Sequence, residues 1–233
     1  MAVIDSGIHA AHPHILGIAG GVSIADDGEP TGDTTDRIGH GTAVAAAIRE
    51  KAVDVELYAV KIFGQTLSAT GGRVARAIRL AADAGAQVIN LSLGTKRQEH
   101  AALFTDALND ATVQGACLVA AEQSDGTSWL PGSLPGVIPV RLDWDCPRQG
   151  YRLLETAEGL RVLAAGYPRP IPGVPPEANL SGISFAVANV SGWVARVREA
   201  RPGACVEEVM AVLARHSGTS LAPAARPQPA SPR

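Results

Sequence analysis

The sequence predicts an α/β fold of three layers, in which a mainly parallel central sheet is flanked by helices. Short apolar runs, often β-branched, alternate along the chain with longer segments of helical periodicity. The 233 residues are 46% hydrophobic but only 4% aromatic, so the core must be packed with small aliphatic side chains. This length suits one large domain.

Five short apolar runs are predicted to be buried strands. A parallel strand that is covered on both faces shows a continuous apolar stretch rather than an alternating one. The predicted strands cover residues 2–4, 55–62, 88–93, 117–121 and 137–140.

The segments between and after these runs are predicted to be helices. Val74, Ile78 and Ala81 recur at the spacing of one helix face, while the arginines around them fall mostly on other faces. Gly85 and Gly115 directly follow two of the segments, as glycines commonly do at helix ends. The predicted helices cover residues 42–51, 73–84, 101–114, 185–199 and 206–215.

Two segments show neither pattern. Residues 142–176 read as irregular and become proline-rich toward their end. Residues 219–233 carry several prolines and have little to bury, so we expect them to be disordered. The predicted organisation is a single domain over residues 1–218 followed by this tail.

Composition excludes several classes of function. Twenty Lys and Arg against 23 Asp and Glu give a net charge of −3, which argues against a nucleic-acid partner or an anionic membrane surface. No apolar run reaches the roughly 18–20 residues that cross a bilayer. Three cysteines without metal-ligand spacing indicate neither a disulfide framework nor a zinc site. The first residues lack the regions of a signal peptide, so we expect a cytoplasmic protein.

Three polar residues stand where chemistry is expected. Asp5 ends the first predicted strand, at the edge where open α/β sheets bind ligands. His40 lies between two glycines at the start of an Ala-rich helix, and imidazole suits proton transfer near neutral pH. Ser184 opens another predicted helix, whose dipole favours negative charge near its oxygen. Taken singly, each also has an ordinary interpretation, such as a helix cap.

The order Asp, His, Ser and the surrounding motifs resemble the subtilisin-like serine peptidases, or subtilases. The motifs are Val-Ile-Asp-Ser-Gly-Ile around Asp5, His-Gly-Thr-Ala-Val-Ala from His40, and Gly-Ile-Ser-Phe-Ala around Ser184. Residues 57–61 and 88–94 are similar to family segments as well. The resemblance implies a subtilisin-like fold and a hydrolase that cleaves peptide bonds through an acyl-enzyme without a cofactor. A structural calcium ion is possible, but no segment matches the family's calcium sites.

The resemblance also implies a role for each residue. Ser184 would be the nucleophile, His40 the general base and then the general acid, and Asp5 the group that fixes the imidazole tautomer. The backbone N–H of Ser184 would be one oxyanion donor. The segment Ser92-Leu93-Gly94 would pair with an extended peptide and form one wall of the pocket for the side chain before the cleaved bond.

The chain departs from the family at the second oxyanion donor. The family usually has Ala-Ala-Gly-Asn where this chain has Ala-Ala-Glu122-Gln123. Gln123 keeps a carboxamide on a longer side chain, so we expect it to replace the family's Asn at least partly; losing such a donor costs about 10²–10³ in rate. Glu122 either lines the pocket and favours a basic residue before the cut, or points to solvent or bonds locally.

Other residues have two interpretations. His9, His12 and His14 could hold a metal ion, or be exposed loop histidines. Trp129 could be a packing anchor or could touch substrate. The acidic loop before His40 is expected to be solvated surface, with a calcium site as a lesser possibility; it contains Asp26, Asp27, Glu29, Asp33 and Asp36.

The leading hypothesis is a serine endopeptidase with a narrow task, such as cleavage of a precursor or leader peptide, whose partner is an extended peptide or protein substrate. The alternative is a subtilase-fold module that binds peptides but is catalytically weak because its oxyanion hole is impaired. An unrelated nucleotide-binding protein would need a glycine-rich phosphate loop after the first strand, and residues 5–9 do not form one.

Overall fold

The computed structural model describes residues 1–25, 28–64, 66–123 and 127–217. The tail predicted over residues 219–233 lies outside this range, as do Asp26 and Asp27 of the acidic loop. Among the described residues, no helix combines the length and the apolar character needed to cross a membrane.

The described residues form a nine-stranded sheet in the order β3-β2-β4-β1-β5-β6-β7-β9-β8. All pairings are parallel except β2 with β3 and β8 with β9, the pairs at the two edges. The predicted α/β fold with a mainly parallel sheet is therefore confirmed. The strands are β1 (Ala2–Asp5), β2 (Gly20–Ile24), β3 (Pro30–Thr31), β4 (Tyr58–Lys61), β5 (Val88–Leu91), β6 (Cys117–Gln123), β7 (Val137–Leu142), β8 (Arg152–Thr156) and β9 (Gly159–Ala164).

All five predicted strands are present, as β1, β4, β5, β6 and β7, but the expectation that residues 142–176 are irregular was wrong in part. β8 and β9 form an antiparallel hairpin there, and β9 adds to the sheet in parallel with β7. The hairpin escaped prediction because β8 is an edge strand of mostly exposed or half-buried residues and has no continuous apolar run.

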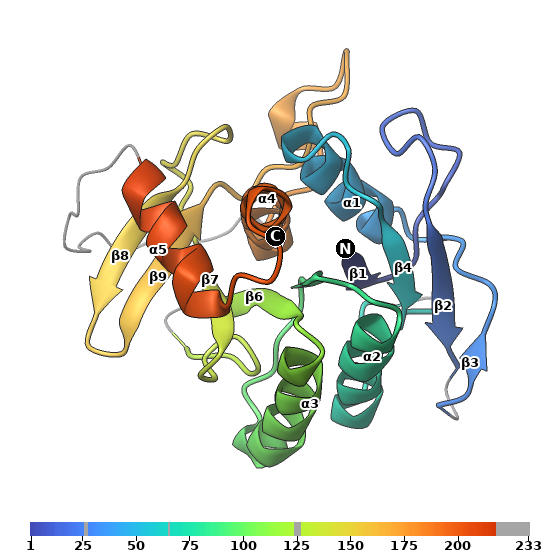
Figure 1. Ribbon diagram of the computed structural model, residues 1–233. Coiled ribbons are helices and arrows are strands. Elements are labelled where there is room, and N and C mark those ends of the chain that lie inside the picture. The colour runs from blue at the N-terminus through green and yellow to red at the C-terminus, as the bar shows by residue number, and fades with distance from the viewer. Residues whose placement is uncertain (26–27, 65, 124–126, 218–233) are drawn as a thin grey trace.

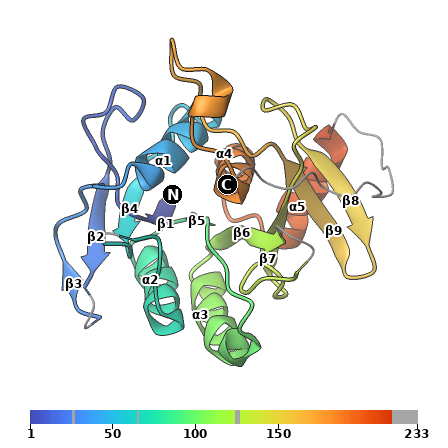
Figure 2. The same ribbon diagram turned by 180° about the vertical axis from the view of Figure 1, so that it is seen from behind.

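The five predicted helices are also present. Two short 3₁₀ turns accompany them, η1 (Gln98–His100) and η2 (Pro176–Ala178). The ribbon views show α2 and α3 together on one side of the sheet and α1, α4 and α5 on the other (Figures 1 and 2). The helices are α1 (His40–Lys51), α2 (Gly71–Asp83), α3 (Ala101–Val113), α4 (Ile183–Ala200) and α5 (Val206–His216).

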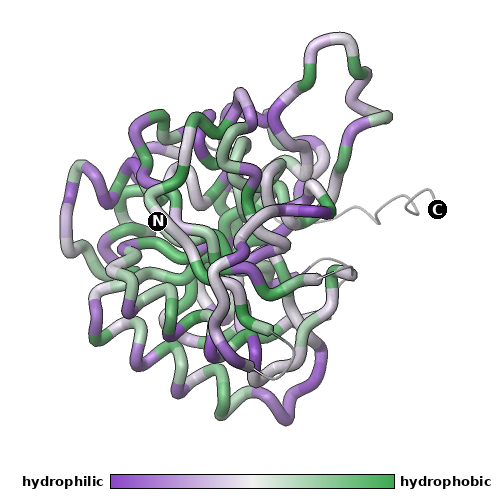
Figure 3. Tube along the Cα trace, turned by 90° about the vertical axis from the view of Figure 1, so that its right-hand side faces the viewer, coloured by the Kyte–Doolittle hydropathy of each residue, from purple (hydrophilic) through white to green (hydrophobic). Residues whose placement is uncertain are grey.

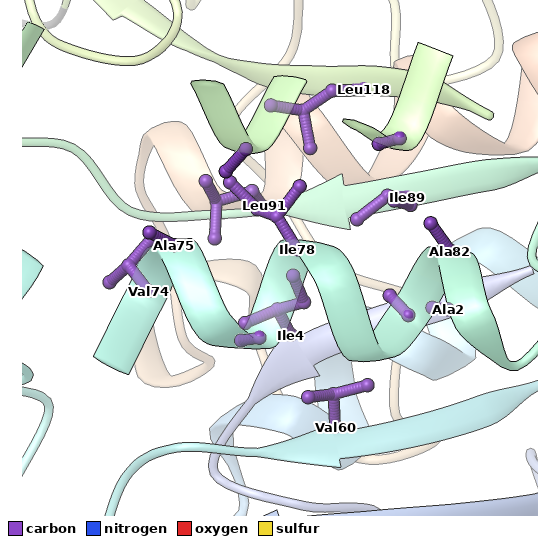
Figure 4. Packing of buried hydrophobic residues seen from close by; sticks show 14 of the residues in the cluster. Ala2, Ile4, Val60, Val74, Ala75, Ile78, Ala82, Ile89, Leu91 and Leu118 are labelled. Carbon is purple, nitrogen blue, oxygen red and sulfur yellow. The ribbon is translucent and has the colours of Figure 1, made fainter. Parts of the chain in front are cut away.

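Alternation along β1 decides which side of the sheet each residue faces. Ala2 and Ile4 belong to the core shared with α2 and α3, whereas Val3 packs with α1. Asp5 falls on the same side as Val3, so the strand directs it toward the start of α1. Figure 4 shows the packing under α2, with these residues labelled: Ala2, Ile4, Val60, Val74, Ala75, Ile78, Ala82, Ile89, Leu91 and Leu118.

The helices bury one side each, as their sequences predict. Along the helical coils the tube in Figure 3 alternates between hydrophobic and hydrophilic residues, as expected for helices with one face on a core. The proline-rich segment that contains η2 projects from the body beyond α1 and α4 (Figure 1) and leads back to the start of α4. It thereby delivers Ser184 to the carboxyl-terminal side of the sheet.

Candidate active site

Asp5 and His40 form the centre of the candidate site. Asp5 ends β1 and is only 1% exposed, and its Oδ1 lies 2.7 Å from Nδ1 of His40, the first residue of α1. Gly41 permits this approach, because a Cβ there would lie 2.2 Å from the carbonyl oxygen of Gly7 and 3.1 Å from Cβ of Asp5. The imidazole is thus held by a buried carboxylate at the carboxyl edge of the sheet.

Asp36 is a site residue that the sequence analysis missed. Its Oδ1 accepts hydrogen bonds from the N–H groups of Ile38 and Gly39 (2.9 and 2.8 Å), and its Oδ2 accepts from the N–H and hydroxyl of Thr42 (2.8 and 2.6 Å). The expectation that this residue belongs to a solvated acidic loop was therefore wrong. Asp36 lies three residues before Gly39, the N-cap of α1, so it matches no standard capping motif and no local signal distinguished it from the other acids of the loop.

Asp36 also ties α1 to β1 through Ser6. The Ser6 hydroxyl donates to Asp36 Oδ1 (2.9 Å) and accepts from the backbone N–H of Gly41 (2.9 Å). Lys61 holds the same loop, because its buried ammonium donates to the carbonyl oxygen of Thr35 (2.5 Å). The backbone on both sides of His40 is therefore fixed by hydrogen bonds to elements of the sheet edge.

Electrostatics favour the charged form of His40. Burial by itself would lower its pKa, but the hydrogen bond and the charge of Asp5, with the further charge of Asp36, outweigh burial and raise the pKa above its usual value. Burial likewise opposes ionisation of Asp36, yet its hydrogen bonds from Thr42, Gly39 and Ile38 hold the pKa below the usual range. The carboxylate bonded to the ring and a second, more distant carboxylate thus both favour the protonated imidazole.

Ser184 lies in the first turn of α4, which follows Gly182 with its φ of 143°. The Ser184 hydroxyl donates to the carbonyl oxygen of Ser92 (3.2 Å), and the Ser92 hydroxyl donates to the Ser184 carbonyl oxygen (3.2 Å). Ser92 also donates to Oδ1 of Asn90 (3.0 Å), whose amide donates to Ser191 (2.9 Å). The start of α4 is therefore bound to the end of β5.

The structure brings Ser184 to the same end of the sheet as His40 without a hydrogen bond between them. The ring of Phe185, the next residue, has its centroid 5.8 Å from that of His40, and α1 and α4 share a buried core. The hydroxyl bonds to Ser92 instead. Catalytic hydrogen bonds are often long or misaligned in a free enzyme and tighten when substrate binds.

Gln123 is the last residue of β6, at a bulge where the register with β7 shifts. It is half-buried, and its backbone forms a bridge with Ser128. Within the described ranges no hydrogen bond holds its side-chain amide. Among the described residues the side-chain amide therefore has no hydrogen-bond partner, and it lies at the edge of the sheet where Asp5 ends β1.

Glu122 bonds locally, which was one of the two interpretations that the sequence allowed for this residue. It is 2% exposed, and both of its oxygens pair with the guanidinium of Arg141, with NH2 of Arg141 3.0 Å from Oε1. Nε of Arg161 lies 3.3 Å from the same Oε1. Burial opposes ionisation, but the two arginines hold the pKa of Glu122 below its usual value. The expectation that Glu122 lines the pocket and selects a basic residue is corrected accordingly.

The segment Ser92-Leu93-Gly94 continues from β5 toward the site. Directly after it, Thr95 and Leu130 exchange two backbone hydrogen bonds of 2.9 and 2.8 Å. The segment Ser92-Leu93-Gly94 therefore lies between Ser184 on one side and residues 128–130 on the other.

A cavity of about 450 Å³ opens on the outer side of α1. It is bordered by Gly39, by the histidine-rich turn, and by Asn179 and Leu180 of the segment that leads to Ser184. The rings of His12 and His14 are 5.2 Å apart, edge to face. Over the residues that the structure describes, no His, Cys, Asp or Glu side chains cluster as metal ligands would.

Comparisons with known proteins identify the family of this chain. The family model described as "Subtilase family" matches residues 1–137. Subtilisin Savinase of Lederbergia lenta is 33% identical over 216 residues, covering 87% of this chain and 77% of that protein. An alkaline protease of Alkalihalobacillus alcalophilus is also 33% identical, and the chain spans about half its length, 54%. The nisin leader peptide-processing serine protease NisP of Lactococcus lactis is 34% identical over 157 residues, which cover 54% of this chain and 23% of that protein.

Solved structures show the same fold. The epidermin leader peptide processing serine protease EpiP from Staphylococcus aureus superposes with a TM-score of 0.69 at 18% identity, covering 92% of this chain and 68% of that one. The prenylagaramide maturation protease PagA gives a TM-score of 0.63 at 24% identity, covering 91% and 80%.

Proposed function

Because this chain belongs to the subtilase family of serine peptidases, we propose that it hydrolyses peptide bonds with Asp5, His40 and Ser184 as its catalytic triad. The observation that carries the proposal is the 2.7 Å contact between the buried Asp5 carboxylate and Nδ1 of His40, at the sheet edge where Ser184 lies in the first turn of α4. With Nδ1 bonded to Asp5, the other ring nitrogen, Nε2, is free to act as the base.

In the proposed reaction Ser184 Oγ attacks the peptide carbonyl carbon while His40 Nε2 takes the hydroxyl proton. The imidazolium, stabilised by Asp5, then gives that proton to the leaving amine as the C–N bond breaks, which leaves an acyl-enzyme. Water attacks the ester through the same base and frees Ser184. The proposed steps need only protein groups and water, so we propose no cofactor.

Ser184 must first turn away from Ser92. Its present bond to the Ser92 carbonyl is a neutral hydrogen bond, worth about 0.5–1.5 kcal/mol net. That is small beside the stabilisation available from an aligned base and oxyanion donors. We therefore assign the observed hydroxyl position to the resting enzyme.

We assign the oxyanion to two donors. The backbone N–H of Ser184 belongs to the first turn of α4, where N–H groups lack helical partners. The Gln123 amide would be the second donor, and its lack of a partner within the described ranges supports this.

The substrate would be an extended peptide. Its part before the cleaved bond would lie along Ser92-Leu93-Gly94, beside Ser184. Its leaving part would pass on the side of His40, which protonates the new amine, and the cavity at Gly39 and Leu180 borders that side. The relative NisP is named for processing a leader peptide, which supports a narrow substrate such as a precursor or leader peptide.

The decisive experiment labels the protein with a fluorophosphonate and follows cleavage of a proteome-derived peptide library by mass spectrometry. Labelling and cleavage should both be lost in Ser184→Ala and be retained in Ser181→Ala, a matched change at an exposed serine three residues away. A folded protein that binds peptides without labelling would instead establish the second candidate, a peptide-binding module. The Ser184–Ser92 hydrogen bond is the observation that favours that second candidate.

A further inference from the structure

We propose that Trp129 fills the pocket for the side chain before the cleaved bond, so that the site accepts only small residues there. The proposal rests on the proposed peptidase function, and it assigns that site a substrate class: peptides with Gly, Ala or Ser before the cut. Trp129 would be the specificity-determining residue.

Backbone hydrogen bonds place Trp129 between the end of β6 and the segment that is proposed to form one wall of the pocket. Its N–H donates to the carbonyl oxygen of Glu122 at the end of β6 (2.7 Å). The next residue, Leu130, pairs with Thr95, which directly follows Ser92-Leu93-Gly94. Trp129 therefore joins the strand end that carries Gln123 to the segment that would hold the peptide.

The Trp129 side chain packs against the α-carbon of Gly94. A Cβ at residue 94 would be 2.8 Å from Cε3 of Trp129 and 3.0 Å from its Cβ, closer than real side-chain contacts allow. Only glycine at position 94 leaves room for the indole. The space beside this wall, where a substrate side chain would go, is thus occupied by Trp129.

The indole is held in place by its surroundings. Trp129 is half-buried and packs against a core that includes Ala121 of β6, and Ile183, the residue before Ser184, packs against the same core. The turn after Trp129 is equally close-packed, since a Cβ on Gly132 would lie 2.0 Å from the carbonyl oxygen of Ala121. Moving the indole aside would require displacement of this packing.

The chemistry of the remaining pocket fits a small, uncharged side chain. The Glu122 carboxylate is neutralised by Arg141 and Arg161 and offers no free charge to a basic residue.

The test compares two peptides that differ only in Ala or Phe before one cleavage site. We expect the unmodified protein to cleave the Ala peptide with a kcat/KM at least about 100-fold above that of the Phe peptide, and Trp129→Ala to reduce this ratio about 10-fold or more. Because both peptides are measured on one sample, the ratio does not depend on the fraction of folded protein. Trp129→Phe, which keeps an aromatic ring, should give an intermediate ratio.

Trp193→Phe, a change to a half-buried tryptophan later in α4, is the matched control and should leave the ratio unchanged. A preference for Phe in the unmodified protein, or an equal ratio in Trp129→Ala and the unmodified protein, would overturn the inference. Fluorophosphonate labelling of Ser184 reports separately on the proposed function. If neither peptide is cleaved or Ser184 labelled, the proposed function fails, and the ratio of the two peptides' Kd values still decides whether Trp129 limits the pocket.

Discussion

The Asp36 carboxylate bonds both to Thr42, two residues after His40, and to Gly39, directly before it. Because the same carboxylate accepts from Ser6, the residue after Asp5, one side chain fixes the distance between the two members of the Asp–His pair. Asp36 is therefore a positioning residue for His40.

Asp36→Asn should lower kcat/KM and shift its acid limb to lower pH. The charge of Asp36 raises the pKa of His40, so its removal lowers that pKa, and the base becomes neutral at a lower pH. If Asp36 had a purely structural role, its replacement would reduce activity without shifting the acid limb of the pH–rate profile. Asp33→Asn is the control, because Asp33 is exposed and pairs with Arg37. A pH–rate profile of kcat/KM for the three proteins is the measurement, and an unmoved limb in Asp36→Asn would refute the assignment.

Asp5→Asn should reduce kcat by about 10⁴-fold while the fold is kept, because an amide at this position holds the wrong imidazole tautomer. Steady-state kinetics on one peptide, with circular dichroism to check the fold, is the measurement. A variant that retained more than a tenth of the activity would show that Asp5 does not orient His40.

Stability should fall as His40 loses its proton. Its folded-state pKa is raised, so the charged ring stabilises the protein fully below the unfolded pKa of about 6.5, and this contribution is lost as pH rises through the folded pKa. Activity needs the neutral ring and should rise over the same window. Urea unfolding between pH 5 and 9 should therefore show a decline that is absent in His40→Gln; the same decline in both proteins would contradict this assignment.

Gln123→Ala should lower kcat by about 10²–10³-fold with little change in KM, because an oxyanion donor acts mainly in the transition state. Gln123→Asn should retain or exceed the original kcat, since it restores the amide that the family places there. Steady-state kinetics on one peptide suffices. If all three proteins had the same kcat, this amide would have no part in the reaction.

Glu122→Gln should destabilise the protein by about 3–5 kcal/mol, because it leaves the guanidinium groups of Arg141 and Arg161 without their buried counter-charge. Glu158→Gln removes an exposed partner of Arg161, 3.9 Å away, and should change stability little. The Glu122 pKa is lowered, so its contribution should be present above the usual carboxyl range and be lost as pH falls below it. Urea midpoints of the two variants at pH 7 and pH 4 decide the matter; equal midpoints would refute it.

The buried elements were predictable because their signals are local. A continuous apolar run such as 117–121 encodes a covered strand, and the spacing of Val74, Ile78 and Ala81 encodes one helix face. The β8–β9 hairpin was missed because only four of its eleven strand residues are buried, so its sequence differs little from that of a loop.

The candidate site likewise contains features that local sequence predicts and features that it does not. The fold class and the family could be read from the sequence, as could the placing of an acid at a strand end and of a histidine and a serine at helix starts, since each depends on a short run of neighbouring residues. Three other contacts required the folded chain: Glu122 pairs with Arg141 and Arg161, the Ser184 hydroxyl bonds to Ser92, and Trp129 packs against Gly94. These pairings join residues from different elements, so strand register and packing choose the partner of each charge and each ring, and no local pattern records that choice.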